Sequence, residues 1–229
     1  MTTTQPRPSV PPGGSSGDAA GRRSSRGGRA VLVLAIALLL VLLVRTFVVQ
    51  TFSIPSDSMT PTLRPGERVL VWRVGAGDVQ RGDVIVFDGT GTFTDAPPAP
   101  QGLAKVGAGV AGLLGFRPGE SDFVKRVVGL PGDRITCCDA QGRLLVDGKP
   151  LEEPYVQPGD AASDVAFDIE VPQGRLWVMG DHRSDSVDSR SHLGSPGGGT
   201  IAVDDVIGRV VAITWPLDAV GTVGRGSAS

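Results

Sequence analysis

Few residues in this sequence are suited to breaking a covalent bond, and a serine stands out first. Ser58 lies in the stretch FSIPSDSMTPTL, residues 52–63, where prolines restrict the backbone and small hydroxyl and acidic residues gather. The chain has only two histidines, His182 and His192, both in a polar segment rich in Ser, Asp and Arg. A fixed backbone suits a nucleophile, so Ser58 is the candidate nucleophile.

Lys125 is the candidate base because it lies inside the apolar run FVKRVV, residues 123–128. A serine hydroxyl is a poor nucleophile at pH 7, and the group that takes its proton must be neutral when it acts. Strand alternation would turn Lys125 inward and Arg126 outward, and burial lowers the pKa of a lysine. The pattern is compatible with a Ser-Lys dyad. The alternative left open is that both residues are charges on an exposed strand face.

Composition excludes several other functions. The 22 basic and 24 acidic side chains give a net charge of -2 and form no basic stripe, so we expect no nucleic-acid partner. The only cysteines, Cys137 and Cys138, are adjacent and offer no metal-ligand spacing, so we expect neither a metal nor a cofactor. Two free thiols and a disulfide both remain possible for this pair.

An apolar run near the N-terminus predicts a membrane anchor. Residues 1–29 are rich in Pro, Gly, Ser, Thr and Arg and predict a disordered cytoplasmic tail, and residues 30–49 are apolar enough to span a bilayer. The arginines before this run place the N-terminus in the cytoplasm and the rest of the chain outside the cell membrane. A cleavable signal peptide is the alternative, but bulky residues follow the run where small ones would be needed.

The remainder reads as a mostly β domain over residues 50–220. Short β-branched runs alternate with Gly, Pro and Asp, which predicts an antiparallel sheet rather than a doubly wound α/β fold. A segment rich in Gly, Ala and Pro at about 89–121 predicts an insertion, either a surface loop or an apolar segment that leans on the bilayer or the substrate. Residues 221–229 predict a flexible C-terminal tail.

Five stretches occur in a fixed order after the anchor: PSDSMTPTL, GERVLV, RGDVIVF, FVKRVVGLPGD and MGDHRSDSVDSR. Together they resemble the sequence boxes of bacterial type I signal peptidases, over about residues 29–216. The resemblance implies a single-pass serine endopeptidase with an extracytoplasmic antiparallel β domain. It would cut signal peptides from exported preproteins after small residues of the Ala-x-Ala type. Its partners would be those preproteins, as they emerge from the export machinery, and the lipid bilayer.

The same resemblance assigns roles to individual residues. Ser58 matches the nucleophile and Lys125 its general base, while Ser56 matches a hydroxyl that helps the Ser58 N–H bind the developing oxyanion. Ser186 matches the serine that orients the lysine amine. The remaining matches are Asp188 and Arg190, a supporting ion pair, and the substrate-binding positions Ile54, Pro55, Met59 and Val124.

The sequence also departs from the family pattern. Asp57 stands where glycine is common, His182 stands where asparagine is frequent, and the insertion after Phe87 is long. The charge of Asp57 would raise the pKa of Lys125 if the two side chains approach.

Three rival interpretations remain. One is a hydrolase in which His182 or His192 is the base for Ser58, although no serine lies in a G-x-S-x-G elbow. Another is a self-cleaving repressor with the same dyad, which the anchor and the missing DNA-binding helices disfavour. The third is a membrane-tethered β binding module without catalytic activity, for which neither Ser58 nor Lys125 would matter.

Overall fold

The computed structural model describes residues 24–95 and 121–226, so the predicted tail before residue 24 and most of the predicted insertion lie outside the described residues. Residues up to Leu42 and residues from Leu43 onward form two separate compact units. The first contains most of one long helix, and the second is a β domain.

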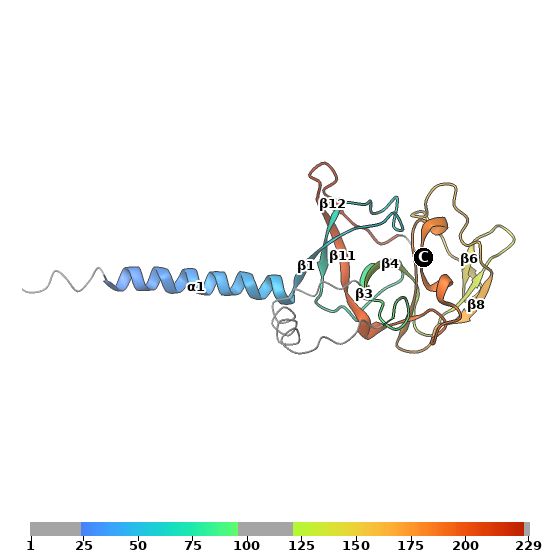
Figure 1. Cartoon of the computed structure of the whole chain (residues 1–229), viewed down its shortest axis with the longest axis horizontal. Coiled ribbons are helices and arrows are strands. Elements are labelled where there is room, and N and C mark those ends of the chain that lie inside the picture. The colour runs from blue at the N-terminus through green and yellow to red at the C-terminus, as the bar shows by residue number, and fades with distance from the viewer. Residues whose placement is uncertain (1–23, 96–120, 227–229) are drawn as a thin grey trace, which may run out of the picture. The chain divides into compact units, whose positions relative to one another are not determined.

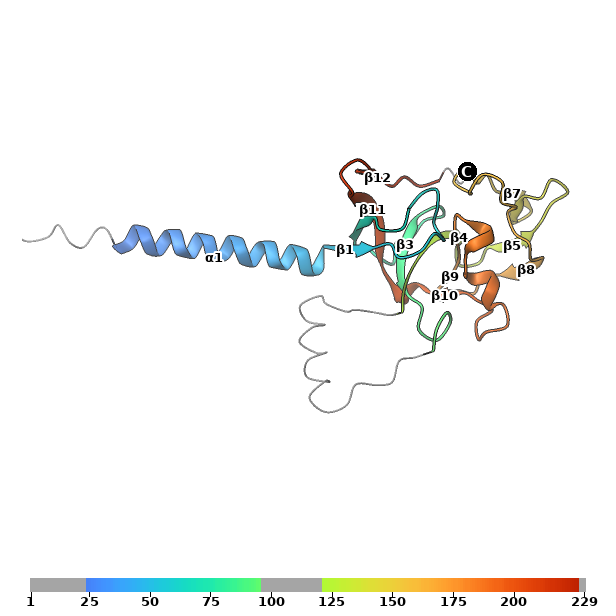
Figure 2. The ribbon, with the colours of Figure 1, turned by 45° about the horizontal axis from the view of Figure 1, so that its top comes forward.

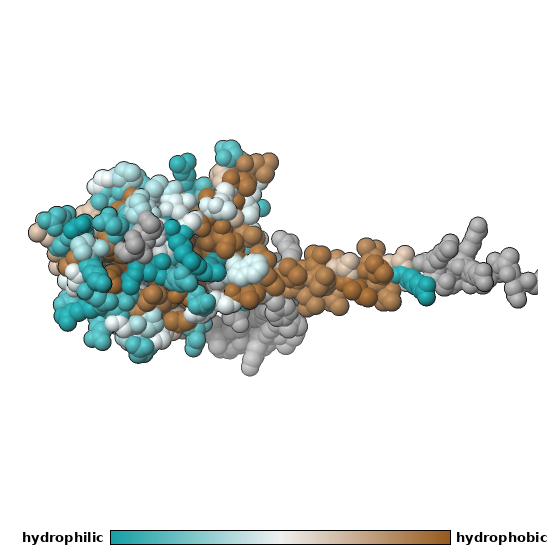
Figure 3. Space-filling model, turned by 180° about the vertical axis from the view of Figure 1, so that it is seen from behind, coloured by the Kyte–Doolittle hydropathy of each residue, from teal (hydrophilic) through white to brown (hydrophobic). Residues whose placement is uncertain are grey.

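The helix α1 (Ser24–Phe47) contains the predicted anchor only as far as Phe47, because Val49 already begins the strand β1 (Val49–Ser53). Its stretch Gly27–Val44 is, within the described part of the chain, the one helix long and apolar enough to cross a membrane. Hydrophobic side chains from Val31 to Val44 are exposed and cover its surface (Figure 3). The helix begins before the predicted residue 30, because adding a residue to an existing helix costs far less than starting one.

Eight strands form the larger sheet of the domain, and every neighbouring pair is antiparallel (Figure 1). In spatial order they are β1 (Val49–Ser53), β2 (Arg68–Trp72), β11 (Val206–Trp215), β3 (Val84–Asp88), β4 (Asp122–Gly129), β9 (Arg175–Met179) and β10 (Ile201–Ala202), with β12 (Gly221–Thr222) paired to β11. The predicted mostly antiparallel β fold is therefore confirmed.

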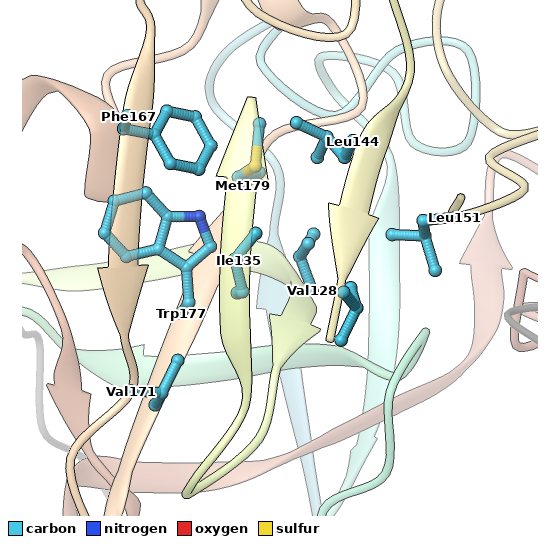
Figure 4. Close-up of a cluster of buried hydrophobic side chains, with 9 residues drawn as sticks. Val128, Ile135, Leu144, Leu151, Phe167, Val171, Trp177 and Met179 are labelled. Carbon is cyan, nitrogen blue, oxygen red and sulfur yellow. The ribbon is translucent and has the colours of Figure 1, made fainter. Parts of the chain in front are cut away.

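A second, four-stranded antiparallel sheet lies at the end of the domain away from β1 and β11 (Figure 2). Its strands in spatial order are β7 (Lys149–Pro150), β6 (Leu144–Val146), β5 (Arg134–Cys137) and β8 (Phe167–Glu170). A core cluster joins it to the larger sheet, and the Trp177 and Phe167 rings lie 5.1 Å apart in it (Figure 4). The cluster also contains Val128, Ile135, Leu144, Val146, Leu151, Val171 and Met179.

A different hydrophobic cluster fixes the segment that carries Ser58. Ile54, Met59 and Leu63 are buried in it against apolar side chains of β2, β3 and β11. Apolar anchors therefore stand on both sides of Ser58. Burying each such side chain contributes roughly 1.5–3 kcal/mol, so the segment is held by packing as well as by its prolines.

The ends of β3 and β4 that flank the predicted insertion are paired with each other, as in a closed hairpin. Asp88 of β3 lies opposite Asp122 of β4, and the Gly89 N–H donates to the Ser121 carbonyl at 2.8 Å. The turn after Gly89 packs Phe93 on the rings of Phe87 and Phe123.

The loop after β9 contains two short 3₁₀ helices, η1 (Arg183–Asp185) and η2 (Ser189–His192), and a third, η3 (Val203–Asp205), precedes β11. The first lies in the segment MGDHRSDSVDSR and the second begins in it. This segment is bonded to β4 through Asp181 and Arg126 and to β9 through Ser189 and Val178.

The C-terminal segment differs from the predicted flexible tail. β12 pairs with β11, and Arg225 forms an ion pair with the buried Asp83 at 2.7 Å. Gly226 lies against the Tyr155 ring, where any β-carbon would overlap the ring. Residues 221–226 are therefore docked, because a small residue and a buried counter-charge favour contact over solvent.

Cys137 and Cys138 form a disulfide, and the described residues include no free cysteine. The choice that composition left open is decided in favour of the bond.

Candidate active site

The structure brings Ser58 and Lys125 together although 67 positions separate them. Lys125 Nζ and Ser58 Oγ form a hydrogen bond of 2.7 Å, and both residues are buried, Lys125 with only 4% of its surface exposed. Packing holds the Ser58 segment in place and β4 carries the lysine. A base within hydrogen-bond reach of a hydroxyl is the geometry that proton abstraction needs.

Burial lowers the pKa of Lys125 from 10.5 to about 8. The Asp188 and Asp181 carboxylates partly oppose this by raising the pKa, and the Arg190 guanidinium lowers it. The strongest acidic influences on Lys125 therefore come from the loop after β9 rather than from Asp57. A lysine with this pKa has a useful neutral fraction near neutral pH.

Arg126 is also buried, and the expectation that it turns outward is wrong. Only 1% of its surface is exposed, because the face of β4 opposite Lys125 is covered as well. Its guanidinium makes two hydrogen bonds to the Asp181 carboxylate, at 2.8 and 2.6 Å, and lies 4.0 Å from the centre of the Tyr155 ring. The two bonds to Asp181 and the contact with the Tyr155 ring compensate the buried charge of the Arg126 guanidinium. Strand alternation alone predicted that this charge would lie in solvent.

Ser58 lies inside a hydrogen-bonded turn. The Thr60 N–H donates to the Asp57 carbonyl at 2.9 Å, so Ser58 and Met59 are the two central residues of the turn. Ser56 is exposed, and its Oγ lies 3.4 Å from Ser58 Oγ. The predicted oxyanion hydroxyl is thus beside the nucleophile.

Asp188 and Arg190 form the predicted ion pair. Arg190 Nη2 lies 2.7 Å from Asp188 Oδ2, and the same carboxylate accepts the Gly180 N–H at 3.0 Å. Burial raises the pKa of Asp188, but the Arg190 guanidinium and the Gly180 N–H lower it more, so the net shift is downward. The carboxylate therefore stays charged and fixes the loop to the end of β9.

The Ser186 hydroxyl oxygen is buried near the Asp188 carboxylate, whose pKa it helps to lower, but it makes no well-aligned hydrogen bond to a described residue. It lies against the α-carbon of Gly180, as does the Ser58 carbonyl oxygen, and a β-carbon on Gly180 would overlap both atoms. Glycine at this position lets Ser186 and the nucleophile segment converge.

The predicted substrate-binding residues are divided between core and surface. Ile54 and Met59 are buried in the cluster under the Ser58 segment, Val124 packs against the same cluster, and Pro55 is exposed. Ile54, Pro55 and Met59 belong to the segment that carries Ser58, and Val124 precedes Lys125 on β4. Asp57 is exposed at the same turn.

Neither histidine ring takes the place of Lys125. Among the described residues, His182 Nδ1 contacts Thr60 Oγ1 and His192 Nδ1 contacts the Asp188 carbonyl, whereas Ser58 Oγ is bonded to Lys125 and Ser56. Within the same residues, no group of three or more His, Cys, Asp or Glu side chains could hold a metal ion.

Sequence reasoning assigned Asp181 a loop-fixing role but missed its pair with Arg126 and the close approach at Gly180. Asp181 is fully buried as the partner of Arg126, and Gly180 is the point where three parts of the site meet. An acidic residue after an apolar strand, with an arginine inside another apolar strand, was the signal for the pair. Nothing local in the sequence indicates the close approach at Gly180.

The chain is similar in sequence to known signal peptidases over most of its length. The family model described as "Signal peptidase, peptidase S26" matches residues 28–215. The probable signal peptidase I of Mycobacterium leprae is 38% identical, covering 84% of this chain and 76% of its own. The signal peptidase I of Mycobacterium tuberculosis is 36% identical, covering 88% and 76%. A solved signal peptidase I from Enterococcus faecalis aligns with a TM-score of 0.37 and 22% identity, over 58% of this chain and 96% of that one, a likeness too weak to add to the assignment.

Proposed function

Since the chain belongs to the signal peptidase family, peptidase S26, and is a serine endopeptidase, we propose that Ser58 cleaves signal peptides with Lys125 as its general base. The observation that carries this proposal is the 2.7 Å hydrogen bond between two buried side chains, one of them a lysine with a pKa of about 8. A neutral amine in that position is aimed at the proton it has to remove.

The reaction proceeds in two proton-balanced halves. Neutral Lys125 takes the Ser58 proton as Oγ attacks the scissile carbonyl, and the resulting ammonium gives this proton to the leaving amine as the C–N bond breaks. A water then attacks the ester, loses its proton to Lys125, and the acid leaves as Ser58 recovers its hydrogen. The Ser58 N–H and the Ser56 hydroxyl bind the oxyanion in both halves, and removing one such donor typically costs ~10²–10³ in rate.

Ser186 serves to orient the lysine. Its buried oxygen makes no well-aligned hydrogen bond to a described residue, has the Asp188 carboxylate nearby, and lies beside Gly180, close to the main chain of Ser58. A hydroxyl that bonds the amine restricts rotation about the last lysine bonds and turns the lone pair toward Ser58 Oγ. The Asp188–Arg190 pair holds the loop that presents this serine.

We infer that the substrate binds as an added strand along the first half of β4. Phe123, Val124 and Lys125 are in register with β3 on one side, whereas the pairing of β4 with β9 begins only at Arg126. Among the described strands, the other edge of Phe123–Lys125 is therefore not occupied. An extended peptide there would gain main-chain hydrogen bonds and place alternate small side chains, as in Ala-x-Ala, toward Ile54, Pro55, Met59 and Val124.

We also propose that α1 anchors the enzyme in the cell membrane as a single span, with its N-terminus in the cytoplasm and the catalytic domain outside. The support is the length and apolar surface of the helix and the arginines that precede it. The partners would then be the bilayer and preproteins leaving the export machinery.

The test is cleavage of a preprotein with an Ala-x-Ala site by the full chain in detergent. Ser58→Ala and Lys125→Met should each abolish product, whereas the matched surface variants Ser191→Ala and Lys149→Met should cleave like wild type. Mass spectrometry of the product gives the bond that was cut. Full activity of either dyad variant would disprove the dyad, and an inactive wild-type protein would favour a binding module.

A further inference from the structure

His182 touches the nucleophile turn at two points. Its backbone N–H donates to the Ser58 carbonyl at 3.2 Å, and its ring Nδ1 lies 3.1 Å from Thr60 Oγ1. One residue of the loop after β9 thereby contacts the turn on both sides of Met59.

The backbone of His182 is held from both directions along the chain. The preceding residue, Asp181, is paired with buried Arg126, and the following residue, Arg183, is paired with Glu153, both in buried positions. His182 itself is half-buried. Two buried ion pairs on adjacent residues leave its main chain little freedom, so it can act as a fixed support for whatever it touches.

The proton arrangement of the ring contact follows from the hydrogen bonds of Thr60. Thr60 Oγ1 lies 2.9 Å from the Asp57 carbonyl oxygen, which can only accept, so the single hydroxyl proton is directed to Asp57. Toward His182 the hydroxyl oxygen must therefore accept, and Nδ1 must carry the proton. The neutral Nδ1–H tautomer satisfies this requirement.

We propose that His182 is a positioning residue for Ser58. It holds the turn from Asp57 to Thr60, so that Ser58 Oγ and the Ser58 N–H keep the orientation that the reaction needs. This rests on the proposed Ser-Lys chemistry. Oxyanion donors act only when they are fixed before the reaction, so loosening the turn should lower kcat more than it raises KM. The residue does not exchange a proton with the substrate.

A histidine-to-asparagine replacement separates positioning from proton transfer. The asparagine side-chain nitrogen is bonded to Cγ, as Nδ1 is, so His182→Asn can still donate to Thr60, but it cannot act as a base near pH 7. His182→Ala and Thr60→Val each remove the contact. Thr136→Val, which alters a hydroxyl on β5 in the second sheet, is the matched control.

The experiment measures kcat, KM and the pH profile for preprotein cleavage by the full chain in detergent. We expect His182→Ala and Thr60→Val to lower kcat by about threefold to tenfold, the factor that corresponds to one hydrogen bond, with KM nearly unchanged. Thr60→Val also removes the hydroxyl bond to the Asp57 carbonyl, so the double variant should be no slower than Thr60→Val, because His182→Ala then has no ring contact left to remove. His182→Asn and Thr136→Val should retain wild-type kcat, and the acidic limb of the profile should not move.

Other results would overturn the proposal. Equal losses in His182→Asn and His182→Ala, or disappearance of the acidic limb in His182→Asn, would make the ring a proton carrier. Wild-type kcat in Thr60→Val would show that the ring contact does not position the turn, even if His182→Ala failed to fold. These results differ from failure of the dyad itself, which would appear as undiminished cleavage by Ser58→Ala or Lys125→Met.

Discussion

Lys125 and Arg126 are consecutive residues of β4, and both side chains are buried, on opposite faces of the strand. One face carries an amine with a lowered pKa next to Ser58, and the other carries a guanidinium paired with Asp181. The cost of burying a positive charge is reduced differently on the two faces. Lys125 becomes easier to neutralise, whereas Arg126 keeps its charge and gains a counter-ion.

The lysine pKa predicts the pH dependence of cleavage. Only the neutral amine can accept the serine proton, so kcat/KM should rise through an ionisation near pH 8 and level off above it. At pH 7 roughly a tenth of the enzyme would be in the active form. Initial rates between pH 6 and 10 would check this, and a limb near pH 6.5 would point to a histidine instead.

The same shift predicts that stability rises with pH in a defined window. Because the folded pKa of Lys125, about 8, is below the unfolded value of 10.5, the unfolded chain binds more protons between these two values. The free energy of unfolding should therefore gain up to roughly 3 kcal/mol from this group between pH 8 and 10.5. Urea unfolding across this range should show the gain in wild type and Lys149→Met, but not in Lys125→Met. Parallel curves for Lys125→Met and wild type would contradict it.

The Arg126–Asp181 pair predicts a large loss of stability when one partner is removed. Asp181→Asn leaves a guanidinium buried without its counter-ion, which should lower the free energy of unfolding by about 3–5 kcal/mol. Tryptophan fluorescence during urea unfolding measures it, since Trp177 is buried in the core. The control is Asp168→Asn, which breaks a pair with Arg134 whose side chains are 48% and 66% exposed and should change little. Similar effects in the two variants would refute the importance of burial.

Gly180 predicts a position where one methyl group stops catalysis. Gly180→Ala would push its β-carbon into the Ser58 carbonyl oxygen and the Ser186 hydroxyl, displacing the nucleophile by a fraction of an ångström or more. Misplacement on that scale should lower kcat by at least about 10²-fold. Gly194→Ala, whose β-carbon would meet no atom within 4 Å, should cleave normally. A fully active Gly180→Ala enzyme would mean that the loop can move away without cost.

The fold could be predicted from the sequence for reasons that are local, whereas the pairing of Ser58 with Lys125 also needed the resemblance of five sequence stretches to a known family. Alternation and turn residues mark the strands, and a lysine inside an apolar strand is unusual enough to notice. The burial of Arg126 could not be predicted, because alternation says which face a side chain takes but not whether that face is covered. Docking of Arg225 on Asp83 was equally hidden, since it depends on a partner 142 positions away.

The closed hairpin between β3 and β4 has a consequence for how this enzyme can vary. Asp88 and Asp122 are already in register, and Gly89 is already bonded to Ser121, before the chain departs toward residues 96–120. The strand that carries Lys125 is therefore aligned independently of what joins the two ends. Loop length adds only slowly to the entropy of closing such a connection, so this junction is a natural insertion point, where a tag or a foreign module can be added without shifting Lys125.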